Sequence, residues 1–146
     1  MLVREMTIAD LDEVYRIEQE TFSDPWSKRS FLESISDTNN RYLVAMVDDN
    51  IAGYCGYWGV VGEGYIYNVA VNPNFRRQGI GYRMLEELIA QAESRGISSL
   101  TLEVRQSNRA AIDLYKKLGF TEAGIRKDFY TKPLEDAIIM WRGSIH

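Results

Sequence analysis

A glycine-containing loop constrains this chain more than any other segment. Residues 76–81 read RRQGIG and lie between an apolar run at 65–71, typical of a strand, and a helical apolar pattern that ends at Gly96. Glycines let the backbone approach a ligand without a Cβ in between, and a helix start offers unpaired N–H groups at its positive end. The loop therefore predicts a strand-loop-helix unit that binds an anion, most naturally a phosphate.

The same loop has three other interpretations. A plain strand-to-helix turn with surface arginines is one, because glycine pairs are common at turns. A Walker P-loop needs Gly, four residues and then Gly-Lys followed by Ser or Thr, which the sequence lacks. A Rossmann fingerprint needs a third glycine where Met84 stands, although Glu103 falls near the acidic position of that motif. The plain turn and, more weakly, the dinucleotide site stay open beside the anion site.

Apolar periodicity predicts alternating strands and helices along the whole chain. The predicted strands are 2–6, 41–47, 51–58, 65–71, 99–104, 120–125 and 137–141. The predicted helices run from residue 8 through Ile17, from Ser27 through Ile35, from Gly79 to Gly96 and from Asn108 to Gly119. This order indicates a mixed sheet with helices on its faces. No linker or repeat divides it, so we expect residues 1–146 to form a single domain.

The counts of reactive residues limit the chemistry. The 146 residues include one cysteine, Cys55, which excludes an internal disulfide and a multi-cysteine zinc site. The single histidine is the last residue, His146, which disfavours a Ser-His-Asp or Cys-His arrangement. An enzyme with this sequence must move protons with carboxylates, tyrosines, lysines or water, and we expect no metal.

Charge is distributed unevenly along the chain. Residues 1–75 carry 12 acidic and 5 basic side chains, whereas residues 76–146 carry 9 acidic and 12 basic ones. The division predicts either two partners of opposite charge or an uneven solvated surface. A pI of about 5.1 argues against direct nucleic-acid binding. No apolar run approaches the ~18 residues that span a bilayer, and the N-terminus is not a secretory signal, so we expect a cytoplasmic protein without a membrane partner.

Two blocks of the sequence resemble a known family. The spacing Arg-x-x-Gly-x-Gly at residues 76–81, after a strand ending in NVAVNP, resembles the acyl-CoA site of the GNAT superfamily of N-acyltransferases. The run NRAAIDLYKKLGF at residues 108–120 resembles the second conserved block of that family. Segments 17–19, 25–27, 102–105, 107–108 and 135–140 resemble in particular the bacterial RimI-type ribosomal-protein-alanine acetyltransferases.

The resemblance implies a GNAT-like acyl-CoA N-acyltransferase fold of the α/β (α+β mixed) class, with a mostly antiparallel mixed sheet of about seven strands and about four helices. It also implies transfer of an acetyl group from acetyl-CoA to an amine. Residues 69–71 are implied to pair with the pantetheine arm, and the glycine loop to hold the pyrophosphate. The implied cofactor-binding residues are Val69, Ala70, Val71, Arg76, Arg77, Gln78, Gly79, Ile80, Gly81, Tyr82 and Asn108.

Two residues are implied to carry the proton transfers. Glu103 is the implied base, acting directly or through a water, and Tyr115 is the implied acid for the departing thiolate. Simpler interpretations stay open. Glu103 can instead pair with Arg105, Arg126 or a lysine, and Tyr115 can be a core residue. Cys55 lies in an apolar run and lacks a base, so we expect direct transfer in a ternary complex.

The resemblance implies an acceptor amine at a protein N-terminus, namely an alanine of a basic ribosomal protein. Loop 22–27 and segment 126–136 are implied to frame a peptide channel, with Phe22, Trp26 and Tyr130 touching the substrate, although the first two can be packing residues. The acidic segment 18–24 would attract a basic peptide, and the basic half of the chain would hold the polyanionic cofactor.

Other acceptors and a second functional class remain alternatives. A lysine side chain or a small-molecule amine can be the acceptor, because a fold does not fix its substrate. A CoA-binding module without catalysis is a further alternative, which the retention of Glu103 and Tyr115 disfavours. We expect a monomer or a weak dimer.

Overall fold

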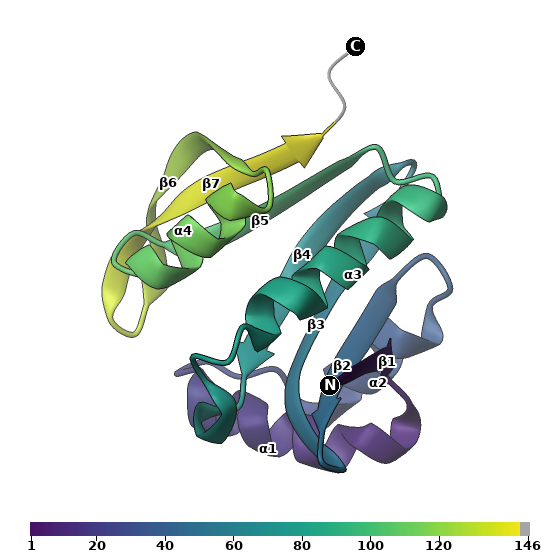
Figure 1. The fold of residues 1–146 in the computed structure, drawn as a ribbon. Coiled ribbons are helices and arrows are strands. Elements are labelled where there is room, and N and C mark those ends of the chain that lie inside the picture. The colour runs from purple at the N-terminus through teal and green to yellow at the C-terminus, as the bar shows by residue number, and fades with distance from the viewer. Residues whose placement is uncertain (144–146) are drawn as a thin grey trace.

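The computed structural model describes residues 1–143, so His146 lies outside the described residues. Its strands are β1 (Leu2–Glu5), β2 (Arg41–Val47), β3 (Asn50–Val60), β4 (Glu63–Val71), β5 (Ser99–Arg105), β6 (Thr121–Thr131) and β7 (Leu134–Gly143). Its helices are α1 (Leu11–Thr21), α2 (Lys28–Ser36), α3 (Ile80–Ser94) and α4 (Arg109–Lys117), with short 3-10 turns at Ile8–Asp10 and Pro73–Phe75. The order of strands and helices is the one predicted from the sequence (Figure 1).

The strands of the described chain form one sheet of seven, in the order β1-β2-β3-β4-β5-β7-β6. Every neighbouring pair is antiparallel except β4 with β5. Parallel neighbours need a crossover connection, and α3 supplies it. The prediction of a mostly antiparallel mixed sheet with about four helices is confirmed.

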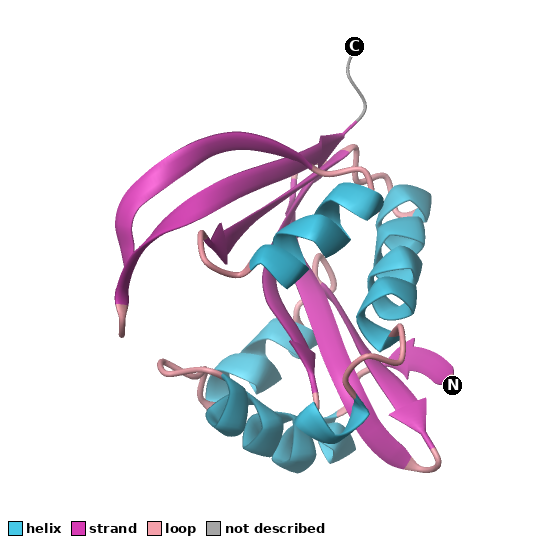
Figure 2. Cartoon of the chain, turned by 60° about the vertical axis from the view of Figure 1, so that its left-hand side comes forward, coloured by secondary structure: helices cyan, strands magenta, loops and turns pink. Residues whose placement is uncertain are grey.

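The helices cover the two faces of the sheet in pairs (Figure 2). Along β2, Leu43 and Ala45 belong to the core cluster that contains α3 and α4, whereas Tyr42 and Val44 belong to the cluster that contains α1 and α2. Successive strand residues point to opposite faces, so this alternation puts one pair of helices on each face. No helix among residues 1–143 is long and apolar enough to cross a membrane.

Strands β4 and β5 part soon after they meet. They are paired over three residues only, ending at Tyr65 opposite Thr101, and then diverge (Figure 1). Just beyond that point the register of β4 with β3 shifts beside Gly56, which leaves Tyr67 as an extra, bulged residue of β4. A bulge bends its strand and re-aims the side chains that follow. The rest of β4 and β5 therefore borders a gap in the middle of the sheet.

Local signals place turns and helix starts where the sequence predicts them. The Ser30 N–H donates to Ser27 Oγ at 3.0 Å, so Ser27 caps α2 as expected. Asp48 and Asp49 have positive φ angles of 49° and 66°, the geometry of a two-residue hairpin turn between β2 and β3.

Several element boundaries differ from the sequence prediction. Ile8 was expected on the apolar face of the first helix, but it lies in a 3-10 turn and is 69% exposed. The Asp10 carboxylate accepts the Thr7 N–H at 2.8 Å, which ties this turn together and starts α1 only at Leu11. Strands β6 and β7 are longer than the predicted 120–125 and 137–141. The added residues of β6 and β7 are mostly exposed and carry no apolar alternation that would indicate a strand.

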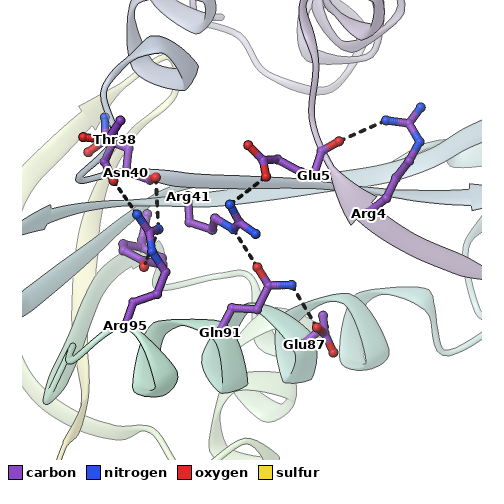
Figure 3. Close-up of polar contacts among 9 residues, drawn as sticks. Arg4, Glu5, Thr38, Asn40, Arg41, Glu87, Gln91 and Arg95 are labelled. Atoms are coloured by element: carbon purple, nitrogen blue, oxygen red, sulfur yellow. Dashed lines mark hydrogen bonds and ion pairs between the residues drawn. The ribbon is translucent and has the colours of Figure 1, made fainter.

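A polar network ties α3 to the edge of the sheet (Figure 3). The Arg41 guanidinium of β2 donates to Glu5 Oε2 at 2.7 Å and to Gln91 Oε1 of α3 at 2.6 Å. Arg95, at the end of α3, donates to the Asn40 carbonyl at 3.2 Å. These bonds fix the C-terminal end of α3. They thereby set the direction of the helix axis, and the glycine loop lies at the other, N-terminal end of that axis.

We predict that Asp10→Ala lowers the free energy of unfolding by about 2 kcal/mol, because charge-assisted hydrogen bonds to a buried carboxylate are lost. Both Arg4 Nη atoms donate to Asp10 at 2.8 Å. These hydrogen bonds lower the pKa of the Asp10 carboxyl, so its contribution is present above about pH 4 and is lost as the pH falls through the lowered pKa. Urea denaturation of both proteins at pH 7 and pH 3 measures the effect.

Glu5→Ala is the matched control for Asp10→Ala. Glu5 pairs with Arg41, but its side chain is 60% exposed, and such pairs contribute less than about 1 kcal/mol. An Asp10→Ala loss that is no larger than the Glu5→Ala loss, or that persists unchanged at pH 3, would contradict the prediction.

Candidate active site

A cavity of about 600 Å³ lies where β4 and β5 diverge. Its walls come from both strands, the loop between α1 and α2, helix α4 and the tip of the β6–β7 hairpin. The predicted site residues that line it are Phe22, Trp26, Val69, Arg76, Glu103, Asn108, Tyr115 and Tyr130. The structure thus brings residues with predicted catalytic, cofactor and substrate roles to one cavity.

Glu103 reaches this cavity from β5. Its side chain is 8% exposed, and its Oε2 accepts hydrogen bonds from Tyr65 Oη and, at 3.2 Å, from Arg126 Nε. Burial and the Glu103 carboxylate raise the pKa of Tyr65, which keeps that hydroxyl protonated as a donor. The pairing with Arg126 considered from the sequence is therefore present, but it engages one oxygen only. Within residues 1–143 no hydrogen-bond donor is bonded to the other oxygen, Oε1.

Tyr115 reaches the same cavity from α4. Its ring packs against Phe120 with 5.8 Å between centroids, and burial raises the pKa of its hydroxyl. Tyr115 belongs to the core cluster on the α3 and α4 face, as do Leu102 and Val104 of β5. Because strand side chains alternate, Glu103 points to the other face. Glu103 and Tyr115 therefore approach the gap from opposite faces of the sheet.

The backbone of β4 is open toward the cavity. The Asn72 N–H donates to the Ala52 carbonyl on the β3 side at 2.8 Å. Because donors alternate along a strand, the Ala70 N–H also points to β3, while those of Val69 and Val71 point into the gap. The Ala70 side chain faces away from α3, in the core cluster of α1 and α2. An extended ligand in the gap can pair with Val69 and Val71 as another strand would.

The glycine loop leads into the N-terminus of α3. Arg77 and Gly79 have positive φ angles of 65° and 73°, and a non-glycine residue in that region often marks a binding site. Gly79 is the N-cap residue and offers no side-chain acceptor, so the first N–H groups of α3 are available to an anion. The loop residues 77–82 lie beyond the wall of the cavity, whereas Arg76 is part of it and donates to the Val71 carbonyl at 3.4 Å.

Asn108 both caps a helix and lines the cavity. Its Oδ1 accepts the Ala111 N–H at 3.2 Å and so caps α4, the helix that carries Tyr115. The same residue lines the cavity opposite β4. A loss of this cap would therefore disturb both the helix and the cavity wall.

Two loops close one side of the cavity. Residues 22–27, which are predicted from the sequence to frame the acceptor channel, are called the acceptor loop. Ser23 Oγ of this loop donates to the Lys132 carbonyl at the tip of the β6–β7 hairpin at 2.7 Å. Arg105 holds that tip by donating to the carbonyls of Lys132 and Pro133 at 3.1 and 3.0 Å, and its guanidinium lies 4.3 Å from the Tyr130 ring centroid. Phe22, 38% exposed, lies at the rim.

The Acetyltransferase (GNAT) family matches residues 11–120 of the sequence. The chain belongs to this family. A ribosomal protein bS18-alanine N-acetyltransferase from Escherichia coli is 42% identical to this GNAT protein over 142 residues, which cover 94% of each chain. The enzyme of the same name from Salmonella typhimurium is 42% identical over 139 residues, with 92% of each chain covered.

The fold agrees with a solved GNAT structure over nearly its whole length. The crystal structure of the ribosomal-protein-S18-alanine N-acetyltransferase from Escherichia coli gives a TM-score of 0.91 at 38% identity. The match covers 99% of this chain and 95% of that chain. The GNAT fold and the resemblance to the bacterial RimI-type enzymes, both predicted from the sequence, are confirmed. The roles of individual site residues stay predictions.

Sequence reasoning missed three parts of this GNAT site. Tyr65, the donor to Glu103, looked like an ordinary strand residue. Glu18, which is 3% exposed and lines the cavity, entered the sequence prediction only through the acidic segment 18–24 and the RimI-like segment 17–19, without a role of its own. Trp26 lines the cavity, but the packing of its ring against Trp58, with 5.9 Å between centroids and an interplanar angle of 59°, was not predicted. No local sequence pattern marks Tyr65 as the partner of Glu103, because the two residues lie 38 positions apart.

We predict that Asn108→Ala lowers the free energy of unfolding by about 1 kcal/mol, because the Ala111 N–H loses its acceptor. Asn108→Ser keeps a capping oxygen and restores most of the loss. Urea denaturation of the three proteins measures both effects. Equal stability of wild type and Asn108→Ala would contradict the cap. A smaller rise of Tm with CoA in the stable Asn108→Ser protein would separate a cofactor contact from the cap.

Proposed function

We propose that this GNAT protein transfers the acetyl group of acetyl-CoA to the α-amine of a protein N-terminus, with an alanine-initiated ribosomal protein of the bS18 type as acceptor. The observation that carries the proposal is the cavity at the parting of β4 and β5, where Glu103, Tyr115 and the open edge of β4 meet. Relatives named for this reaction match nearly the whole chain, which supports the same acceptor.

The residues present fit acetyl-CoA as the donor. The uncapped start of α3 suits a pyrophosphate, and Arg76 and Arg77 add positive charge beside it. Val69 and Val71 offer N–H groups to an extended pantetheine arm, and one of these N–H groups also polarises the thioester carbonyl. The donor supplies the activated acetyl group, while these residues bind it and orient its carbonyl toward the acceptor side of the gap.

Glu103 takes the proton that the acceptor ammonium must lose before its nitrogen attacks the carbonyl carbon. Its Oε1 is the accepting atom, directly or through one water, because Tyr65 and Arg126 engage Oε2. Holding one carboxylate oxygen from two sides fixes the direction in which the other oxygen points. Tyr65 and Arg126 therefore orient the base without touching the substrate.

Tyr115 gives a proton to the sulfur as the bond between carbonyl carbon and sulfur breaks, and the second proton that the attacking nitrogen loses as the amide forms returns to the Tyr115 oxygen by way of water. Burial raises the pKa of Tyr115, so its hydroxyl is protonated at neutral pH. The same dry surroundings raise the basicity of the departing thiolate, because desolvation disfavours both anions. Cys55 is fully buried, and burial raises the pKa of its thiol, which supports direct transfer rather than an acyl-cysteine.

The acceptor peptide enters between the acceptor loop and the tip of the β6–β7 hairpin, where Phe22, Trp26 and Tyr130 contact it. The exposed acidic residues of segment 18–24, Glu20 and Asp24, attract a basic peptide. The proposal also includes the cytoplasm as the place of reaction, where ribosomal proteins are made. A single domain spanning residues 1–146, as a monomer or weak dimer, would carry out the reaction.

A panel of acceptors tests the proposed function. The protein is incubated with acetyl-CoA and, in separate reactions, an Ala-initiated basic peptide, the same peptide with a blocked N-terminus and one lysine, and a set of small amines. Mass spectrometry locates the added acetyl group. We expect acetylation of the Ala α-amine alone or far ahead of the others. Acetylation of small amines or lysine alone would overturn the acceptor assignment, and a lack of any product would overturn the enzyme assignment.

We predict that Glu103→Gln and Tyr115→Phe each lower kcat by about 100-fold, because each removes one proton transfer and keeps the shape of the side chain. The CoA-induced rise of Tm should stay near that of the wild type, since neither group holds the cofactor. Glu122→Gln is the control, because Glu122 pairs with Lys116 on the surface. Wild-type turnover in Glu103→Gln or Tyr115→Phe would remove the corresponding role.

A further inference from the structure

A buried carboxylate lies under the acceptor loop and takes no part in the proposed transfer. Glu18, near the end of α1, is 3% exposed and forms no ion pair among residues 1–143. Burial raises the pKa of its carboxyl. Burying a carboxyl group without a cation is costly, so a side chain of this kind needs a specific set of hydrogen bonds.

Glu18 is held between the sheet and the acceptor loop. Its Oε1 accepts the hydroxyl of Tyr54 at 2.7 Å, and its Oε2 accepts the backbone N–H of Trp26 at 3.0 Å. Tyr54 is fully buried in β3, the strand next to β4. Burial and the Glu18 carboxylate raise the pKa of Tyr54, which keeps it a donor. One side chain thus connects a central strand of the sheet to the backbone of the loop.

The bond to Trp26 acts at the point where the acceptor loop contributes to the cavity. The Trp26 ring packs against Phe31, Trp58 and Tyr67, with centroid distances of 5.3, 5.9 and 6.1 Å. The acceptor loop is also held at Ser23 and at Ser27. Ser23 donates to the hairpin tip, and Ser27 caps α2. Glu18 supplies the tie between these two points, and both Glu18 and Trp26 line the cavity.

We propose that Glu18 is a positioning residue for the acceptor: by anchoring the Trp26 backbone to Tyr54 of β3, it sets the shape of the acceptor side of the cavity and hence the affinity for the acceptor peptide. This inference rests on the proposed function for its kinetic consequence. The donor side, built from α3, α4 and the edge of β4, does not depend on this anchor. Glu18 therefore acts on the KM for the peptide and not on that for acetyl-CoA.

Three variants test the anchor by steady-state kinetics. Glu18→Ala removes both bonds, and we expect the peptide KM to rise about tenfold, the loss of one to two hydrogen bonds, with kcat and the acetyl-CoA KM within about twofold. Glu18→Gln keeps an oxygen that accepts the Trp26 N–H, so its peptide KM should stay within about threefold of the wild type. Glu13→Ala is the control, because Glu13 is an exposed α1 residue paired with Arg16.

Amide hydrogen exchange measured by NMR without substrates gives a second readout that needs no folded Ala variant. In the wild type, the Trp26 amide should exchange more slowly than those of Ser23 and Asp24, and Glu18→Gln should preserve this protection. A peptide KM unchanged in Glu18→Ala, equal rises in both KM values, or Glu18→Gln as impaired as Glu18→Ala would overturn the anchor. An unprotected Trp26 amide in the wild type would also overturn it.

These readouts separate the anchor from the proposed function. If the wild type acetylates no N-terminal peptide, the proposed function fails, and the exchange of the Trp26 amide alone then decides whether Glu18 anchors the loop. If the wild type acetylates the peptide and the Glu18 variants behave like Glu13→Ala, the anchor fails and the proposed function stands.

Discussion

The early end of the pairing between β4 and β5 is the constraint on which the rest of the structure depends. Two parallel neighbours that stayed paired would seal the sheet, and a sealed sheet has no cavity at its centre. Pairing stops at Tyr65, and the bulge at Tyr67 then bends β4 away from β5. The gap leaves backbone N–H groups of β4 without a strand partner, which is costly unless a ligand or water satisfies them.

The gap also lets side chains from both faces of the sheet reach one cavity. In the proposed reaction, the donor side is the one toward α3 and α4, where the glycine loop, Asn108 and Tyr115 are found. The proposed acceptor side is the one toward α1 and α2, where Glu103 points and the acceptor loop closes the cavity. A thioester carbonyl in the gap would have the base on one side and the acid on the other.

The sequence predicts well what is local in the chain. The glycine loop, the cap at Ser27 and the order of strands and helices all follow from neighbouring residues, and the structure agrees. It predicts poorly what depends on distant residues. The bond of Tyr65 to Glu103 spans 38 positions and that of Tyr54 to Glu18 spans 36, and no local pattern encodes either. Ile8 was misplaced because a hydrogen-bonded turn, not apolar spacing, sets the start of α1.

The most direct test of this account is amide hydrogen exchange along β4 with and without CoA. If the gap between β4 and β5 holds the extended arm of the donor, the Val69 and Val71 amides will become protected on binding. The Ala70 amide, which points to β3, will change little. Exchange rates at Val69 and Val71 that stay the same at a saturating CoA concentration would contradict the claim that the parted strands are the donor site.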